Sequence, residues 1–310
     1  MKTISCKFCG ASDSILLYKM RDRMIRTESK DIFDLHLCKQ CGLAYLNPQP
    51  EWQELEYFYG GNYYTNVSRG ERKSSLGEAL YQTARKIKRA VVGPPHPKFW
   101  HFGKGRGRFL DVGCGNGAYD AYVIKDYPQW EFYGIEPSKA SALLAQKTPY
   151  FKVFNGFLEN ACYAPDFFDV ILMSHSLEHT FDPKKTIEEA FRILKKGGRL
   201  VIKVPNFSCP TRTFFGTYWY HLDAPRHLFH FTPEVLTAIL KNAGFTIESI
   251  RFEALSGSVL RSVAYYANRK QFFFEKPFIL MCIHYALVPI KKIAEWFSIA
   301  SGQEIIAVKR

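Results

Sequence analysis

Three histidines lie within ten positions of one aromatic segment, residues 220–234, with the sequence YHLDAPRHLFHFTPE. They are His221, His227 and His230. An imidazole can remove a proton near neutral pH, bind a metal through a ring nitrogen, or pack as a neutral ring. Spacings of six and three residues could bring three nitrogens to one ion, with Asp223 as the nearest acid. From these residues alone, all three roles stay open.

Four cysteines near the N-terminus form two C-x2-C-G motifs separated by 28 residues: Cys6 with Cys9, and Cys38 with Cys41. Two intervening residues let both sulfurs of a pair face one tetrahedral ion, and the glycine permits the tight turn behind them. Four thiolates leave no open coordination position, so the spacing predicts a structural zinc ion and not a catalytic one. A redox-active pair is the alternative, but the repetition of the same motif favours a metal.

A glycine-rich loop, DVGCGNG, follows a short apolar strand at residues 111–117. Glycines let the backbone approach a ligand closely, and the start of the following helix favours negative charge. Glu136, at the end of the next predicted strand, is placed to bind the two ribose hydroxyls of an adenosine. Gly113, Gly115 and Ala118 also satisfy the dinucleotide pattern G-x-G-x-x-G/A. The loop and the acid predict an adenosine-containing cofactor without deciding between cofactor classes.

Strand-like and helix-like segments alternate from residue 108 onward. Hydrophobic patterns predict strands at 108–113, 131–138, 152–157, 167–176, 199–206, 246–254 and 304–310. They predict helices at 117–127, 139–147, 182–194 and 231–245, with a turn at 195–198. Thr232 and Pro233 mark the start of the last helix, and Gly244 marks its end. This alternation predicts an α/β fold with a doubly wound, mainly parallel seven-stranded sheet and helices on both faces.

Four sequence blocks follow one another in this part of the chain: FLDVGCGNG, GIEPS, FDVILMSHSLEHTFDP and KKGGRLVIKVPN. In this order they resemble class I S-adenosylmethionine-dependent methyltransferases, which have a Rossmann-like fold, and the resemblance extends over residues 108–253. An acid two residues before the first glycine, here Asp111, is typical of that family and unusual in dinucleotide-binding folds. The resemblance implies S-adenosyl-L-methionine as the cofactor. It implies that the methionine half of the cofactor contacts Asp111, Gly113, Cys114, Gly115 and Gly117, with Cys114 as a small space-filling residue. It also implies that Glu136 binds the ribose and that Phe157 and Leu158 lie beside the adenine. Ser174 and His175 are then expected near the sulfonium.

A methyltransferase core joined to an N-terminal four-cysteine module is similar to sugar C-methyltransferases that act on nucleotide-linked deoxysugars. In those enzymes a His-Glu-His-aromatic stretch precedes the late helix, and its second histidine is the base. Alignment on the following Phe-Thr puts Pro225, Arg226 and His227 in the three positions. The resemblance therefore gives His227 the role of base. Arg226, in place of the glutamate, is a candidate clamp for an acceptor phosphate or carboxylate; His221 is expected to face the acceptor, and His230 to pack.

Two further histidines, His175 and His179, follow the fourth predicted strand, at the sheet edge where ligands bind in open α/β folds. Both are candidate catalytic residues, although Glu178 and His179 could equally stabilise the start of the helix at Asp182. The form Pro-Arg-His-Leu-x-His-Phe-Thr also looks like a group of shorter methyltransferases, similar to those for quinones and for surface-glycan building blocks.

The formal charge of +13 is concentrated in residues 1–110, which hold 19 Lys and Arg against 10 Asp and Glu. Between Glu78 and Asp111 there is no acid. Such a field attracts a phosphate-bearing partner, whether nucleic acid, an anionic membrane or a nucleotide-linked small molecule; the alternative is the solvated face of one helix. The longest apolar run, 278–288, is too short to span a bilayer, and no apolar h-region opens the chain. We therefore expect a cytoplasmic protein, with peripheral membrane contact through 272–300 as an alternative to packing on the core.

These patterns predict five segments: a zinc ribbon at 1–56, an aromatic linker and basic helix at 57–107, a methyltransferase core at 108–255, a helical insertion at 256–302 and the final strand of the core sheet at 303–310. Two glycines between aromatic residues of the linker suggest a movable lid, with Tyr63 or Tyr64 closing the cofactor pocket.

The whole sequence predicts a methyltransferase that acts on oxygen or carbon of a sugar-like or other small-molecule acceptor, nucleotide- or lipid-linked, in glycan or secondary-metabolite biosynthesis. RNA methylation through the zinc ribbon and the basic stretch is the alternative enzymatic function. A methyltransferase fold that binds without turnover is the alternative without catalysis.

Overall fold

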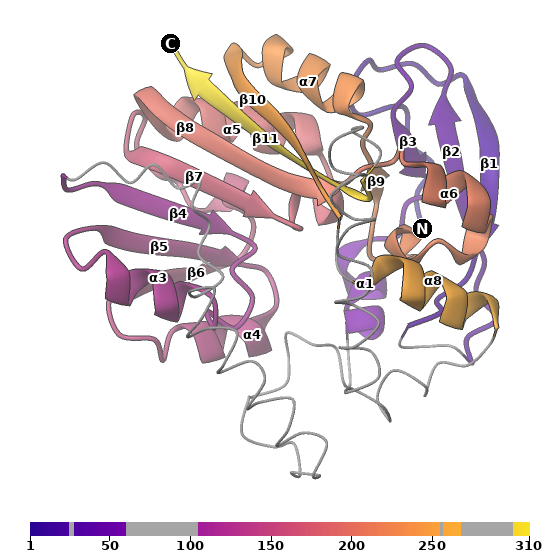
Figure 1. Cartoon of the computed structure of the whole chain (residues 1–310), viewed down its shortest axis with the longest axis horizontal. Coiled ribbons are helices and arrows are strands. Elements are labelled where there is room, and N and C mark those ends of the chain that lie inside the picture. Colours follow the sequence, from indigo (N-terminus) through magenta and orange to yellow (C-terminus); the bar gives the residue numbers. More distant parts are fainter. Residues whose placement is uncertain (25–27, 60–104, 255–256, 268–299) are drawn as a thin grey trace, which may run out of the picture.

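The computed structural model describes residues 1–24, 28–59, 105–254, 257–267 and 300–310. Its main feature is a seven-stranded sheet with the order β10-β11-β8-β7-β4-β5-β6, and a four-stranded sheet lies beside it (Figure 1). The strands of the large sheet run parallel except β11, which is antiparallel to both of its neighbours. The prediction of a doubly wound, mainly parallel seven-stranded sheet is confirmed. The strands are β4 (Arg108–Val112), β5 (Glu131–Glu136), β6 (Phe151–Asn155), β7 (Phe168–Ser174), β8 (Leu194–Pro205), β10 (Phe245–Glu253) and β11 (Gly302–Lys309).

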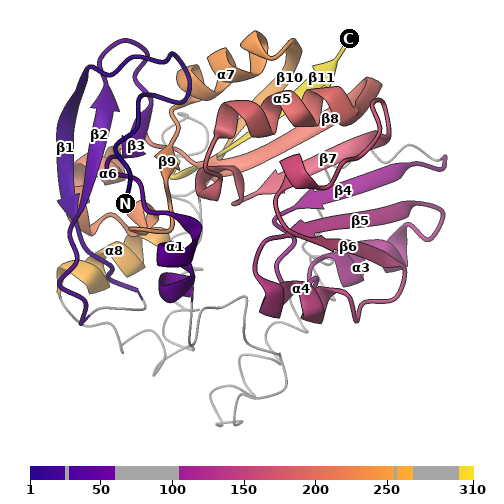
Figure 2. The ribbon, with the colours of Figure 1, turned by 180° about the vertical axis from the view of Figure 1, so that it is seen from behind.

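Helices cover both faces of the large sheet (Figures 1 and 2). On one face, α3 (Asp120–Asp126) and α4 (Lys139–Ala145) pack on β5 and β6. On the other, α5 (Pro183–Ile193) and α7 (Pro233–Asn242) pack on β8, β10 and β11. This arrangement leaves the carboxyl ends of the parallel strands open at one edge, where open α/β sheets bind their ligands.

Helices α5 and α7 begin where side-chain caps are available. Asp182 accepts a hydrogen bond from the backbone N–H of Lys185, and Thr232 accepts one from the N–H of Val235. A proline follows each cap, at a position where its missing N–H costs nothing. The predicted start of α7 is confirmed, although the helix is shorter than the predicted 231–245.

The predicted turn at 195–198 lies inside β8. In the pairing with β7, Leu194 lies opposite Phe168 and Arg199 lies opposite Val170. The residues between Leu194 and Arg199 therefore bulge out of the ladder, because their partners in β7 are only two positions apart. Gly197 has φ +76°, a conformation that glycine adopts without strain. The chain forms a bulge here and not a reversal, because pairing with β7 resumes in the same direction.

The four-stranded sheet combines the N-terminal cysteine segment with a strand from the core. Its order is β1-β2-β3-β9, with β1 (Ser14–Met20), β2 (Phe33–Cys38), β3 (Ala44–Leu46) and β9 (Phe229–His230). Helix α1 (Trp52–Tyr59) follows β3. One cluster of buried side chains contains Leu35 and Tyr45 from this module together with Phe231 and Leu236 from the core. We call residues 1–59 the N-terminal module; its sheet includes a strand that the core contributes.

The remaining described elements are short: α6 (Pro210–Phe215), α8 (Ser258–Tyr266), and the 3-10 turns η1 (Leu158–Asn160), η2 (Leu177–His179), η3 (Gly216–Tyr218) and η4 (Tyr220–Leu222). No helix in the described part of the chain is long and apolar enough to cross a membrane. The predicted lid with Tyr63 and Tyr64, most of the basic stretch and the apolar run at 278–288 lie outside the described residues.

Candidate functional site

The glycine-rich loop connects β4 to α3 at the carboxyl edge of the large sheet. Gly113, Gly115 and Gly117 have φ values of +85°, +56° and +66°, which side chains rarely adopt. A Cβ atom on Gly113 would lie 2.5 Å from Cβ of Ser176, so only glycine lets this loop lie against the end of β7. Cys114 is buried behind the loop, and burial raises the pKa of its thiol. A neutral, space-filling Cys114 is consistent with the role that the sequence predicted.

Glu136 ends β5 beside this loop. Its carboxylate accepts hydrogen bonds from the backbone N–H of Gly115 at 2.9 Å and of Ser138 at 2.8 Å. Burial raises the pKa of Glu136, although these two hydrogen bonds counteract the rise. The two bonds fix the carboxylate at the tip of the loop, where the predicted ribose contact requires it.

Two more carboxyl groups lie behind the loop. Asp111 and Asp120 are buried, and burial raises the pKa of Asp120 to about 7. Burial also raises the pKa of Asp111 well above its usual value, and the charges of Asp120 and Glu136 raise it further. A cation bound beside these three carboxyl groups would favour their ionised forms, whereas the pyrophosphate of a dinucleotide would disfavour them. The sulfonium and ammonium groups of S-adenosylmethionine match this charge.

The residues predicted beside adenine and sulfonium follow β6 and β7 at the same sheet edge. The ring of Phe157 meets Trp52 of α1 edge-on, with centroids 5.4 Å apart, and Leu158 is buried. Ser174 is the last residue of β7 and His175 follows it. The roles of these residues in cofactor binding remain predictions; Tyr63, predicted to close the pocket, lies outside the described residues.

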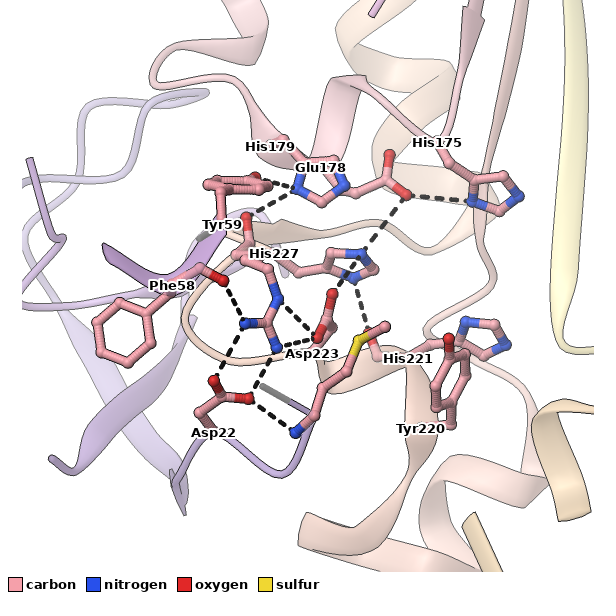
Figure 3. A network of polar contacts seen from close by, with 12 residues as sticks. Asp22, Phe58, Tyr59, His175, Glu178, His179, Tyr220, His221, Asp223 and His227 are labelled. Carbon is pink, nitrogen blue, oxygen red and sulfur yellow. Dashed lines mark hydrogen bonds and ion pairs between the residues drawn. The ribbon is translucent and has the colours of Figure 1, made fainter. Parts of the chain in front are cut away.

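Histidines and carboxylates gather where the end of β7 meets the segment before β9 (Figure 3). We call this group the histidine–carboxylate cluster. Its members are His175, Glu178, His179, His221, Asp223, His227 and His230. The structure thus brings together the five histidines that the sequence analysis considered.

His227 has one ring nitrogen committed and one facing the carboxylates. Its Nδ1 lies 2.8 Å from the backbone oxygen of His221, which can only accept, so Nδ1 carries the proton. Its Nε2 lies 3.8 Å from Asp223 Oδ2 and 4.0 Å from Glu178 Oε1. The ring of His179 packs edge-on against it, with centroids 4.6 Å apart. Nε2, the nitrogen not bound to the carbonyl of His221, therefore points into the cluster (Figure 3).

The protonation states in the cluster are set by the balance between burial and charge. Burial lowers the pKa of His179 to about 4 and that of His221 to about 3, with the neighbouring histidines adding to both shifts. Burial alone would raise the pKa of Glu178, but the hydrogen bond from His175 and the charges of the surrounding histidines hold it at about 2. Burial opposes ionisation of Asp223 too, and Arg226 outweighs it, giving a pKa of about 2. At neutral pH His179 and His221 are therefore neutral imidazoles beside the ionised carboxylates of Glu178 and Asp223.

Two cluster residues have left-handed backbone conformations. His175 has φ +53° and Asp223 has φ +33°. Such conformations in non-glycine residues cost about 1–3 kcal/mol and concentrate at functional sites. The surrounding contacts must hold these two residues in place.

Arg226 contradicts the prediction that it clamps an acceptor. Its side chain is fully buried, and its guanidinium binds oxygen atoms of the protein. It contacts Asp22 at 2.8 and 3.2 Å, Asp223 at 2.6 and 3.0 Å, and the backbone oxygen of Phe58 at 3.0 Å. The sequence could not reveal this engagement, because Asp22 lies 204 positions away.

Metal binding by His221, His227 and His230 was one role that the sequence left open. In the described part of the chain these three do not form a candidate metal group, whereas Glu178, His179 and His227 place donor atoms within 4.8 Å of one another. Ligands that share a tetrahedral ion at about 2.1 Å lie about 3.4 Å apart. The 4.0 Å between His227 and Glu178 is therefore wider than a formed metal site.

The four N-terminal cysteines do converge. Their sulfurs lie within 4.8 Å of one another, with Cys6 and Cys41 3.5 Å apart and Cys9 and Cys38 3.5 Å apart. The glycine after each motif donates its N–H to the first cysteine's backbone oxygen, at 2.9 and 3.0 Å, and has positive φ. Both turns have the geometry that the motif predicted, and the donor set is one that zinc prefers.

The structure is thus an α/β fold with a glycine loop at the carboxyl edge of its parallel strands. A family model described as a methyltransferase domain matches residues 81–250, more than half of the chain, and the chain belongs to this methyltransferase family.

Two methyltransferases are similar to parts of the chain, and one solved structure has a similar fold. The chain is 31% identical over 147 residues to a probable S-adenosylmethionine-dependent methyltransferase of Mycolicibacterium smegmatis, covering 45% of this chain and 52% of the relative. It is 35% identical over 92 residues to the ubiquinone/menaquinone biosynthesis C-methyltransferase UbiE of Pectobacterium atrosepticum, covering 29% and 34%. The chain thus spans about half or less of the length of these relatives. The solved structure of the cyclase SpnF is similar at a TM-score of 0.49 and 19% identity, covering 84% of this chain and 97% of that one.

Three residues at the cluster were missed as site residues. Asp223 lies three positions before Arg226, a spacing that could have indicated an ion pair. Tyr59 places its hydroxyl 2.9 Å from Nδ1 of His179, and Asp22 pairs with Arg226. No local pattern identifies Tyr59 or Asp22, because their partners lie 120 and 204 positions away.

Proposed function

We propose that this protein transfers a methyl group from S-adenosyl-L-methionine to oxygen or carbon of a small polar acceptor, with sugar-like compounds as the acceptor class. The observation that carries the proposal is the orientation of His227, whose Nδ1 contacts the backbone oxygen of His221 and whose Nε2 faces two carboxylates beside the end of β7. The glycine loop and Glu136 lie at the same sheet edge, so the proposed base and the proposed cofactor site are neighbours.

The chain's own residues have distinct roles in this proposal. Asp111, the glycine loop and Glu136 hold the cofactor, which supplies an electrophilic methyl group when bound. His227 accepts at Nε2 the proton that the acceptor's hydroxyl or C–H group loses as its bond to the methyl group forms. Glu178 and Asp223 stabilise the resulting imidazolium, since both are ionised and within 4.0 Å of the ring nitrogen.

The acceptor class follows from polar atoms that protein groups leave unpaired. Within the described residues, four buried atoms of the cluster region have no hydrogen-bond partner: Oγ of Ser176, Oε2 of Glu178, and Nε2 of His221 and of His230. Buried polar groups normally have partners, and hydroxyl groups can both donate and accept. Ionised carboxylates disfavour an anionic group at this end of the acceptor, so a phosphate of a nucleotide- or lipid-linked sugar would lie away from the cluster.

We also propose that the four cysteines hold a structural zinc ion. The convergence of four sulfurs supports it, and so does the pairing of both glycine turns. A closed set of four thiolates supplies folding energy and no catalytic coordination position.

The test is methyl transfer from a radiolabelled donor to a panel of nucleotide-sugars, polyprenyl-linked sugars, quinols and RNA. The proposal predicts labelling of a hydroxylated sugar by the wild type and none by His227→Ala. If only RNA were labelled, RNA would replace sugar-like compounds as the acceptor class. If calorimetry showed no binding of S-adenosylhomocysteine, the assignment of S-adenosyl-L-methionine as cofactor would be wrong.

A further inference from the structure

A buried ion pair links the N-terminal module to the segment that carries His227. The side chains of Asp22 and Arg226 are both fully buried, and their two parallel contacts measure 2.8 and 3.2 Å (Figure 3). Asp22 is itself held in place, because it accepts a hydrogen bond from the backbone N–H of Met24 at 2.8 Å. A bidentate pair of this kind fixes orientation as well as distance.

The backbone on either side of His227 is bound to the module and to η2. The carbonyl of Arg226 accepts a hydrogen bond from Nδ1 of His179 at 2.9 Å. The carbonyl of Leu228 accepts from the N–H of Leu46 in β3 at 2.9 Å, and its N–H donates to the carbonyl of Glu178 at 2.8 Å. Just beyond, β9 pairs with β3 through Ala44 opposite His230. His227 thus lies between two anchored residues.

Asp22 also determines how Arg226 divides its contacts. Nε and Nη2 of Arg226 both contact Oδ1 of Asp223, while Oδ2 of Asp223 faces Nε2 of His227 at 3.8 Å. Arg226 cannot lose its proton. Without Asp22, the buried charge of Arg226 would have one carboxylate fewer to balance it, and Asp223 would be drawn away from the imidazole.

From this geometry we propose that Asp22 is a positioning residue for His227. By holding the guanidinium of Arg226, Asp22 fixes the backbone that carries His227, preserves the bond from Nδ1 to the carbonyl of His221, and leaves Asp223 Oδ2 directed at Nε2. A residue of the cysteine-bearing module thereby acts on the proposed active site without touching substrate. The inference rests on the proposed role of His227 as base, but its central measurement does not require turnover.

The experiment is nitrogen NMR of the histidine side chains in the full-length, zinc-loaded protein, with saturating S-adenosylhomocysteine. The His227 signals are assigned by comparison with His227→Gln. In the wild type the neutral ring should be dominated by the tautomer with Nδ1 protonated. Asp22→Asn weakens the hydrogen bonds that orient Arg226. The tautomer ratio of His227 should therefore shift about fivefold toward the form with Nε2 protonated. Asp34→Asn is the matched control, because Asp34 pairs with Lys19 at 3.3 Å in the same module but away from the cluster.

A second variant covers the case in which Asp22→Asn does not fold, since it leaves a buried arginine partly compensated. Asp22→Leu combined with Arg226→Met removes both charges, and apolar replacement of a buried pair is often neutral for stability. That folded variant should also show the shifted tautomer ratio and at least a tenfold lower turnover of a sugar labelled in the panel, with unchanged affinity for S-adenosylhomocysteine. A folded variant with wild-type His227 signals overturns the inference. If His227→Gln showed wild-type turnover while the Asp22 variants still altered the His227 signals, the role of His227 as base would be refuted. The role of Asp22 in positioning His227 would then still stand.

Discussion

The glycine-loop carboxylates and the histidine–carboxylate cluster are both buried acid groups at one sheet edge, yet their pKa values move in opposite directions. Burial and mutual repulsion raise the pKa of Asp111, and burial raises that of Asp120 to about 7. Burial works the same way on Glu178 and Asp223, but neighbouring cationic groups outweigh it and hold both near 2. The local partners, and not the burial itself, decide the charge.

The comparison indicates how the two halves of the proposed site function. The cofactor half is the glycine loop with Asp111, Asp120 and Glu136, and the cluster half is the histidine–carboxylate cluster. The cofactor half is electrostatically incomplete, so a bound cation would relieve its repulsion. The cluster half is held by partners within the chain, because Arg226 pairs with both Asp223 and Asp22. We therefore expect the first half to respond to ligand and pH, and the second to changes in the protein scaffold.

The largest effect should follow from loss of the zinc ion that we propose at the four cysteines. In Cys41→Ser, zinc binding worth about 10 kcal/mol or more would be weakened or lost, and the N-terminal module should no longer fold stably. Because β3 pairs with β9, the damage should reach the cluster and abolish turnover. Zinc content by mass spectrometry and thermal unfolding measure it, with the exposed Cys162→Ser as control. Retention of about one zinc ion per chain and an unchanged unfolding temperature would contradict the assignment.

The next effect separates the two halves directly. His227→Ala removes the proposed base and should lower turnover about 10²–10⁴-fold. The affinity for S-adenosylhomocysteine, measured by calorimetry, should stay within about twofold, because the glycine loop is intact. His36→Ala is the control: His36 bonds Ser14 at 3.1 Å in the module, away from the cluster. A parallel loss of cofactor affinity in His227→Ala would mean that the two halves are not separable.

The same division explains what the sequence could predict. The glycine loop, Glu136 and the strands that carry them occupy one short run of the chain, and local spacing determines their geometry. The cysteine pairs are similarly local, since each turn is made by consecutive residues. For such features the residue types nearly specify the arrangement, and the predicted sheet and caps were confirmed.

The cluster half depends on contacts between distant segments. The sequence placed Arg226 beside His227 but could not tell an acceptor clamp from a structural ion pair, because Asp22 comes from the other end of the chain. The turn at 195–198 was mistaken for the same reason: pairing with β7, and not the local Lys-Lys-Gly-Gly pattern, keeps those residues in a strand. Which side chains complete a buried charge is a tertiary property.

A smaller effect should come from the acid at the ribose position. Glu136→Ala removes a charged hydrogen-bonding group, worth about 1.5–3 kcal/mol, and should weaken S-adenosylhomocysteine binding about 10–100-fold. Glu131→Ala is the matched control, since it lies in the same strand but on the surface, paired with Arg108 and Lys152. Equal affinities in the two variants would exclude the ribose contact.

The smallest effect is a pH dependence confined to the cofactor half. A bound cation favours the ionised forms of Asp111 and Asp120 and lowers their pKa values, so S-adenosylmethionine should bind with release of protons. Because burial raises the pKa of Asp120 to about 7, the affinity should increase as pH rises from about 6 to 8, by at most about tenfold per pH unit for one proton. Calorimetry in buffers of different ionisation enthalpy measures the proton count. Asp120→Asn should flatten the dependence, whereas Glu178, already ionised across this range, should contribute nothing to it. Affinity that falls with rising pH would show that the carboxylates behind the loop do not face the cationic cofactor.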